Sequence, residues 1–374
     1  MEIKLCFLNL KNSRVILKCN RPEGMNMIKK AGLFVDDGCR NCGVLQWARL
    51  LHYSPQFELS LLEAEDICNG NLDELDLFIC PGGGSARQLR AMQESGQKAV
   101  KRFIENGGAY LGICAGCYNI LNNPDRLQLL PFEFFNCGCG GTAVLTVEIN
   151  NAGAAIMDIA PGNYEVRYSD GPLMKFSDNF CPGTGEVLAV YRNSVSGAGQ
   201  SECYDFNGVP AMICGRYGKG RIVGISFHPE SNESSYPIAI GALYAAAGVK
   251  AIPNFPQTIK RPWRVGFVGR AIIGRTPVLE MFDLESHPDI DLQLIAAPEI
   301  NAGILRHLDL VILPHGVPES YKVFFTPQII ESLTGFMERG GKIFTSGNAS
   351  GFLKNYANLK ILPPATRFYP EIFA

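Results

Sequence analysis

Residues 108–116 read Gly-Ala-Tyr-Leu-Gly-Ile-Cys-Ala-Gly, an apolar run that ends in a cysteine between glycines. The pattern predicts a buried strand, a sharp turn at Cys114 and a helix after it. A side chain on such a turn has a strained backbone and needs small neighbours, which Gly112 and Gly116 provide. Because a helix start favours a thiolate, Cys114 is a candidate nucleophile. The alternative reading is a small buried cysteine that ends a strand.

The segments before this stretch alternate between strands and helices with short connections. We expect strands at 31–35, 57–62, 75–80 and 109–113, and helices at 44–51 and 85–106, the second with Ser85 as its N-cap. Such alternation is typical of a parallel sheet covered on both faces, whose site lies at the carboxyl ends of the strands. Asp36, the loop 81–84 and Cys114 all fall at that edge.

After residue 121 the pattern changes to strands and turns. Further strands are expected at 143–149, 164–168, 187–191, 202–206, 209–214 and 221–227, followed by a helix at 237–247. A glycine-bearing hairpin turn at 217–220 joins the last two of these strands. The last strand runs directly into His228-Pro229-Glu230, so these residues also lie at the end of a strand.

An internal repeat occupies the C-terminal part. Residues 32–116 align without a gap on residues 265–349, so that Leu75-Asp76-Leu77 falls on Leu308-Asp309-Leu310. An ungapped match over three strands and a helix predicts a truncated second copy of the same α/β fold. In the copy, Gly347 stands at the position of Cys114, so the copy cannot repeat the chemistry. We expect it to pack against or cover the first domain, or to mediate homo-oligomers or contacts with a protein partner.

This repeat suggests a division of the chain. We expect a first domain at 1–250, a proline-containing linker at 251–262, and a half-copy of the same fold at 263–374.

A nucleophilic cysteine needs a base to carry its proton, and the base needs a carboxylate to fix its tautomer. Of the five histidines, His228 lies at the strand edge that also carries Cys114, with Glu230 two residues on. Pro229 keeps the backbone between them extended. Considered alone, His-Pro-Glu is an ordinary polar turn. Together with the cysteine turn in one domain, it predicts a Cys-His-Glu triad.

Acyl transfer also needs hydrogen-bond donors for an oxyanion. The N–H groups of Gly83 or Gly84, together with that of Ala115, are candidates, each donor contributing about 3 to 4 kcal/mol to the barrier. The alternative is that the glycines only turn the chain. Arg87 could hold a substrate carboxylate, although an exposed helical arginine is the simpler reading.

Composition excludes several function classes. A hydrophobic content of 47% with 19% charged residues is typical of a globular chain. The net charge of −2 and the absence of a basic stripe exclude nucleic acid as the expected partner. We find no signal peptide and no run long enough to span a membrane. Thirteen cysteines spread along the chain predict free thiols in a reducing compartment, which we take as the cytoplasm.

Two cysteine pairs, Cys39-x-x-Cys42 and Cys137-x-Cys139, could form a metal or redox site. Because their context is not that of a zinc site, free thiols are the favoured interpretation. We therefore expect no metal and no cofactor.

Three motifs together resemble a known family. Pro-Gly-Gly-Gly at 81–84, Gly-Ile-Cys-Ala-Gly at 112–116 and Phe-His-Pro-Glu-Ser at 227–231 are similar to the class I glutamine amidotransferase-like superfamily. The resemblance implies a flavodoxin-like, doubly wound sheet and a triad of Cys114, His228 and Glu230. Phe-Val-Asp-Asp-Gly at 34–38 and the run 112–118 resemble more specifically the N-terminal domain of eukaryotic biotin protein ligases, over roughly residues 31–245.

The chain departs from the family pattern after the cysteine. Glutaminases carry a polar residue such as glutamine where this chain has Cys117 and Tyr118, so Tyr118 would line a different substrate site. No synthetase segment and no biotin ligase catalytic region is recognisable, so the resemblance does not predict ligation. The sequence thus predicts a cysteine hydrolase or amidotransferase-like protein acting on a small amide or ester. The alternative is a non-catalytic ligand-binding or regulatory module.

Overall fold

The computed structural model describes residues 15–17, 29–39, 42–136, 141–194, 205–250, 261–269, 274–316, 318–346 and 349. The chain forms two compact units: residues 1–260 with 273–288, and residues 261–272 with 289–374. None of the helices in the described ranges is long and apolar enough to cross a membrane.

The first unit is built on a ten-stranded sheet. Its centre consists of five parallel strands: β2 (Lys29–Phe34), β3 (Phe57–Leu62), β4 (Leu77–Cys80), β5 (Ala109–Ile113) and β12 (Gly220–Ile225). These strands lie side by side in the order β3-β2-β4-β5-β12. That order is the flavodoxin-like one, so the predicted fold class is confirmed.

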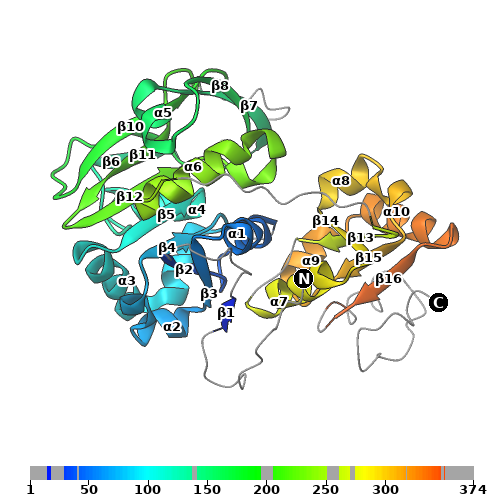
Figure 1. Ribbon diagram of the computed structural model, residues 1–374. Coiled ribbons are helices and arrows are strands. Elements are labelled where there is room, and N and C mark those ends of the chain that lie inside the picture. Colours follow the sequence, from blue (N-terminus) through cyan, green and yellow to red (C-terminus); the bar gives the residue numbers. More distant parts are fainter. Residues whose placement is uncertain are drawn as a thin grey trace. The chain divides into compact units, whose positions relative to one another are not determined.

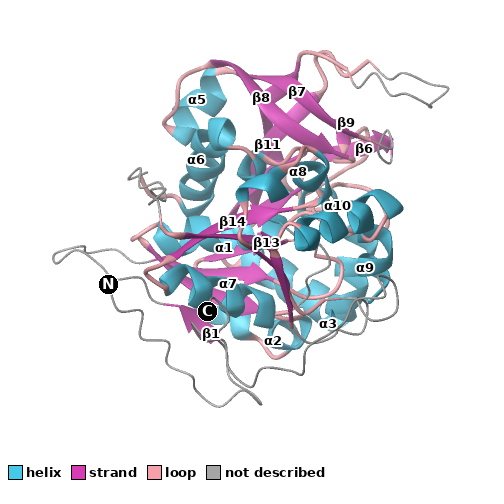
Figure 2. Ribbon diagram, turned by 90° about the vertical axis from the view of Figure 1, so that its right-hand side faces the viewer, coloured by secondary structure: helices cyan, strands magenta, loops and turns pink. Residues whose placement is uncertain are grey.

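Antiparallel strands extend both edges of this centre (Figure 2). Beyond β12 follow β11 (Pro210–Tyr217), β10 (Thr184–Tyr191), β7 (Thr142–Ile149) and β8 (Gly162–Ser169), and β1 (Val15–Leu17) pairs with β3. Strands β6 (Phe132–Asn136) and β9 (Leu173–Phe176) form a separate two-stranded sheet that the sequence pattern did not predict. Most of the strand predicted at 202–206 lies outside the described residues, and Asp205 and Phe206 are not in a strand.

Helices cover both faces of the parallel strands. They are α1 (Cys42–Tyr53), α2 (Ala64–Cys68), α3 (Ser85–Glu105), α4 (Ala115–Asn119) and α6 (Tyr236–Ala247), whereas α5 (Asn151–Met157) packs against α6 and β10. In Figure 1, α1 and α6 lie on one side of these strands and α2 and α3 on the other. Because both faces are covered, β4 and β5 are buried along their whole length. The short 3-10 turns η1 (Asn71–Glu74), η2 (Pro229–Ser231) and η3 (Glu233–Ser235) join these elements.

One predicted cap is wrong. Gly84, not Ser85, is the N-cap of α3, and Ser85 is the first helical residue. Its hydroxyl donates to Asn119 Oδ1 at 2.7 Å, so the side chain bonds another element rather than its own helix.

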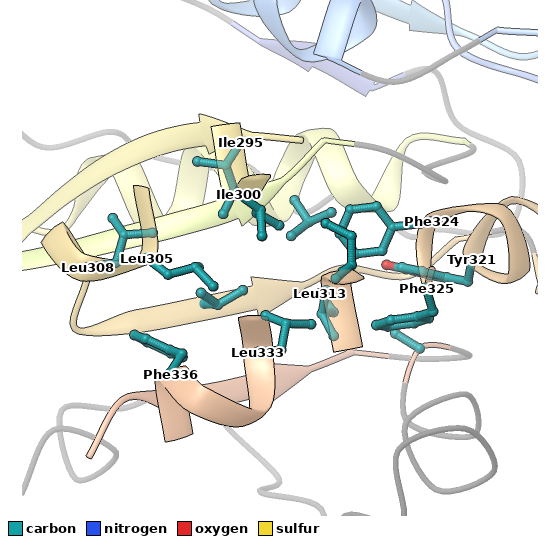
Figure 3. Packing of buried hydrophobic residues seen from close by; sticks show 14 residues of the cluster. Ile295, Ile300, Leu305, Leu308, Leu313, Tyr321, Phe324, Phe325, Leu333 and Phe336 are labelled. Carbon is teal, nitrogen blue, oxygen red and sulfur yellow. The ribbon is translucent and has the colours of Figure 1, made fainter. Parts of the chain in front are cut away.

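The second unit has a smaller sheet of parallel strands. The strands β14 (Ile290–Ile295), β13 (Trp263–Val268), β15 (Leu310–Leu313) and β16 (Lys342–Thr345) are paired in that order. Its other elements are α8 (Ala297–Asn301), η4 (Ile304–His307), α9 (Pro318–Phe324) and α10 (Pro327–Glu338). Side chains including Leu305, Leu313 and Phe336 form one buried core against this sheet (Figure 3).

The predicted second copy is confirmed by the order of its strands. The order β14-β13-β15-β16 reproduces β3-β2-β4-β5 of the first sheet. The bounds of β3, α2 and β4 recur at the same offset in β14, α8 and β15. Among the described residues of the second unit, no strand corresponds to β12, as expected for a truncated copy of the fold.

The helix α7 (Thr276–Ser286) belongs to the first unit by its contacts, although the repeat makes it the counterpart of α1. The contact-based units meet at residues 260/261, 272/273 and 288/289, and the domain boundaries at 250 and 262 stay a prediction. Residues 251–260 of the predicted linker lie outside the described residues, as does Gly347.

Candidate active site

Cys114 occupies the turn between β5 and α4. Its backbone has φ 50° and ψ −101°, a strained conformation for a residue with a side chain. A Cβ added at Gly112 would lie 2.5 Å from the carbonyl oxygen of Gly116, and one added at Gly116 would overlap the carbonyl oxygen of Cys80. Both glycines are therefore needed to accommodate the turn, for the reason that the sequence suggested.

His228 and Glu230 are paired at the end of the strand next to β5. The Nδ1 atom of His228 lies 2.9 Å from Oε1 of Glu230, and the Glu230 side chain is fully buried. The backbone N–H of His228 donates to the carbonyl of Arg167 at 2.8 Å, which ties this turn to β8. The pair has the arrangement in which a carboxylate fixes the orientation of an imidazole.

Gly82 lies between the histidine and the cysteine. A Cβ added at Gly82 would come 2.5 Å from Cε1 of His228 and 3.5 Å from Cβ of Cys114. The structure therefore brings the loop 81–84, the cysteine turn and the His-Pro-Glu turn to one place. Sequence analysis assigned no role to Gly82, because only the folded chain shows that a ring fills the space beside it.

The charges around His228 favour its protonated form. Burial lowers the pKa of His228, but the carboxylate charge of Glu230, the electrostatic effect of Cys114 and the hydrogen bonds to these two residues outweigh it. Together they raise this pKa to about 10. An imidazolium at this position stabilises a neighbouring thiolate.

Two other cysteines, Cys80 and Cys117, are buried close to Cys114. Burial raises the pKa of Cys80 to about 12 and the pKa of Cys117 well above its usual range, so both remain thiols. The Sγ of Cys114 donates to the carbonyl of Ser169 at 3.4 Å. Ser169, at the end of β8, was not predicted, since no sequence signal marks a backbone carbonyl as a partner.

Of the two alternative oxyanion donors predicted in the loop 81–84, one is engaged within the fold. The N–H of Gly84 donates to the carbonyl of Gly38 at 2.7 Å and is therefore engaged within the fold. Gly83, with φ 150°, and Ala115, the first residue of α4, are the predicted donors that remain. The helix predicted after Cys114 is present as α4 and comprises five residues.

A buried amide pair joins the glycine loop to α4. Gln88 Nε2 donates to the carbonyl of Pro81 at 2.8 Å, and Asn119 Nδ2 donates to Gln88 Oε1 at 2.8 Å. Both side chains are almost completely buried. Sequence reasoning missed these residues, although a polar side chain on an otherwise buried helix face is a usable signal.

Asp36 and Arg87 have structural partners at the same sheet edge. The Asp36 carboxylate accepts from the backbone N–H groups of Asp37 at 2.6 Å and Ala64 at 2.8 Å. Arg87 pairs with Asp37 at 2.5 Å on the surface. These contacts fix the turns after β2 and β3, and they favour a structural reading of both residues over a substrate contact.

Tyr118 is a buried residue of α4 that contacts the segment after β8. Its hydroxyl donates to the carbonyl of Asp170 at 3.2 Å, and its ring packs edge-on against Phe134 at a centroid distance of 5.1 Å.

Among the described residues, no group of three or more potential metal ligands occurs. Cys39 is a free, buried thiol that donates to the carbonyl of Phe34 at 3.4 Å. The side chain of Cys42 and both members of the pair Cys137 and Cys139 lie outside the described residues.

Comparison with solved structures gives low similarity. PurLQS from Thermotoga maritima aligns at 18% identity and a TM-score of 0.43, over 58% of this chain and 98% of its own. A thua-like protein from Bacteroides uniformis aligns at 16% identity and a TM-score of 0.42, over 61% of this chain and 95% of its own. No activity is inferred from either.

Comparison with known sequences is more specific. Residues 47–122 match the family described as "Biotin-protein ligase, N terminal". A biotin–protein ligase of Schizosaccharomyces pombe is 24% identical over 182 residues, which cover 43% of this chain and 26% of that protein. This chain thus matches about a quarter of the length of the ligase. The residues 47–122 include the cysteine turn, so the region that carries Cys114 is similar to the N-terminal domain of biotin-protein ligases.

Proposed function

We propose that this protein is a cysteine-dependent hydrolase or acyltransferase in which Cys114, His228 and Glu230 act as a triad on a small amide or ester. The observation that carries the proposal is the buried His228–Glu230 pair, at 2.9 Å, beside a cysteine with a strained backbone. Burying a carboxylate beside an imidazole costs folding free energy. Orienting a catalytic base is a function that would explain why the pair is present.

In the first step, Sγ of Cys114 attacks the carbonyl carbon of the substrate and forms a thioester. His228 gives its Nε2 proton to the leaving amine or alkoxide as the carbon–heteroatom bond breaks. In the second step, His228 takes a proton from water, whose oxygen attacks the thioester and releases the acid and the thiolate. Glu230 stabilises the imidazolium without exchanging a proton. To begin this cycle, the Cys114 thiol leaves its contact with the Ser169 carbonyl and passes its proton to Nε2 of His228, so that a thiolate faces an imidazolium when the substrate binds.

The developing oxyanion would be bound by the backbone N–H groups of Ala115 and Gly83. Removing one such donor typically costs about 3 kcal/mol of transition-state stabilisation. The buried bonds of Gln88 to Pro81 and of Asn119 to Gln88 would hold this loop at a constant position relative to Cys114.

The substrate differs from glutamine in this proposal, because Cys117 and Tyr118 stand where related glutaminases carry a polar residue. The free thiols of the described cysteines support a reducing compartment such as the cytoplasm as the working environment.

The proposal is tested by trapping the thioester. The protein is mixed with a panel of small p-nitrophenyl esters and anilides, and its intact mass is followed by mass spectrometry with peptide mapping. We expect an acyl group on Cys114, and no such group in Cys114→Ala. The matched control is Cys181→Ala, which removes a more accessible free thiol and should acylate like the wild type.

Acylation that persists in Cys114→Ala, or that maps to other cysteines, would refute the triad. The non-catalytic reading of the site would then take precedence. Loss of acylation in His228→Gln with a retained fold would support the role of the base.

A further inference from the structure

Helix α7 connects the repeat with α1 through reciprocal contacts. The Nε atom of Arg49 in α1 lies 2.5 Å from Oε1 of Glu285 in α7, and the rings of His52 and Phe282 lie 4.5 Å apart. By the offset of the repeat, Arg49 corresponds to Phe282 and His52 to Glu285. Each position of α1 therefore touches the counterpart of the other, which is the pattern of an interface with two-fold symmetry.

The contact is buried and polar at its centre. The Glu285 side chain is 5% exposed and also accepts a hydrogen bond from the Tyr53 hydroxyl at 3.2 Å. If α1 packed against a second α1, Arg49 would face His52 instead of a carboxylate. The acidic residue of the copy thus makes α7 a better partner for α1 than α1 itself.

The residues directly before α7 make a second set of contacts within the first unit. Arg275, directly before α7, forms an ion pair with Asp66, and its Nε donates to the carbonyl of Leu61 at 3.2 Å. The N–H of Gly274 donates to the carbonyl of Val35 at 2.7 Å. The helix is therefore anchored at the carboxyl ends of β2 and β3 as well as on α1.

The other end of α1 contacts the candidate active site. A Cβ added at Gly43 would lie 2.9 Å from Oε1 of Glu230, the oxygen that faces His228. Because a helix is stiff over three turns, the position of Arg49 and Tyr53 determines where Gly43 meets Glu230.

We propose that α7 is an internal clamp that holds α1 against Glu230, with Glu285 as a positioning residue for the His228–Glu230 pair. On this proposal the second copy, which has Gly347 in place of the cysteine, supplies a helix that supports the site of the first copy. The effect on reactivity rests on the proposed function, whereas the clamp itself does not.

The test compares Glu285→Gln with Asp283→Asn, which removes an exposed carboxylate from the same helix. Hydrogen exchange reports on the amides of α1, and iodoacetamide alkylation at several pH values reports on Cys114. In Glu285→Gln we expect α1 to exchange about tenfold faster and Cys114 to react several-fold more slowly, because a buried partner is lost. Asp283→Asn should match the wild type in both.

The two measurements test the clamp and the positioning role of Glu285 separately. Unchanged exchange of α1 in Glu285→Gln refutes the clamp, whatever Cys114 does. Faster exchange with an unchanged alkylation profile refutes the positioning role. If Cys114 has no enhanced reactivity even in the wild type, the proposed function fails while hydrogen exchange still decides the clamp. The exchanged pair Arg49→Glu with Glu285→Arg should restore slow exchange, and its failure to do so in a folded protein would count against the ion pair.

Discussion

At the scale of single residues, the site depends on atoms that approach closely. Sequence motifs predicted Cys114, His228 and Glu230, because their residue types and strand-end positions are visible in the chain. The contact with Gly82 and the bond to the Ser169 carbonyl could not be predicted, since they depend on how loops from distant segments meet.

The clearest steric prediction concerns Gly82. In Gly82→Ala the new methyl group would displace the His228 imidazole, so we expect alkylation of Cys114 at pH 7 to slow by about tenfold or more. Gly84→Ala is the control, because its Cβ would meet only Arg87 at 3.6 Å and the N–H to Gly38 is retained. Equal rates in the two variants would contradict this account of the loop.

Glu230 should control the protonation of His228. In Glu230→Gln the carboxylate charge that opposes the effect of burial is removed, so the pKa of His228 should fall well below about 10. An NMR titration of the imidazole measures this value. Glu233→Gln, which changes an exposed acid close by, should leave the pKa unchanged. An unaltered His228 pKa in Glu230→Gln would show that the pair does not form in solution.

At the scale of elements, the parallel strands and their helices follow from local patterns. Predicted strands 57–62 and 109–113 have the observed bounds of β3 and β5. The strand order could not be derived, because pairing among β7, β8, β10 and β11 is set by contacts far apart in the chain. The cap of α3 was misassigned because the Ser85 hydroxyl bonds Asn119 instead.

The contact of α1 with α7 makes the stability of the first unit sensitive to acid. Burial lowers the pKa of His52 to about 4, below its value of about 6.5 in an unfolded chain. The unfolded state therefore binds more protons between these values, and stability is lost as the pH falls from 6.5 towards 4. The variant His52→Phe keeps a ring against Phe282 but has no group that titrates here. We expect its free energy of unfolding to fall less over this pH range.

The difference in unfolding free energy between the two proteins should shift by on the order of 3 kcal/mol from pH 7 to pH 4 in favour of His52→Phe. Chemical denaturation at both pH values measures it. A difference that does not change with pH would contradict a neutral, buried His52.

At the scale of the whole molecule, the repeat was predictable and the grouping of its parts was not. An ungapped offset carries the strand order of the first sheet into the second, as β14-β13-β15-β16 shows. The grouping of α7 with the first unit depends on tertiary contacts of Glu285 and Arg275, which no local pattern reveals.

The central claim is that Cys114 is activated by His228 and Glu230. The most direct measurement is the rate of iodoacetamide alkylation at Cys114 between pH 5 and pH 10, resolved by peptide mass spectrometry, with Cys181 of the same protein as an internal reference. We predict that Cys114 reacts well below pH 8 and that His228→Ala moves its profile towards that of Cys181. A Cys114 profile that follows Cys181 in the wild type, or that His228→Ala leaves unchanged, would contradict the account.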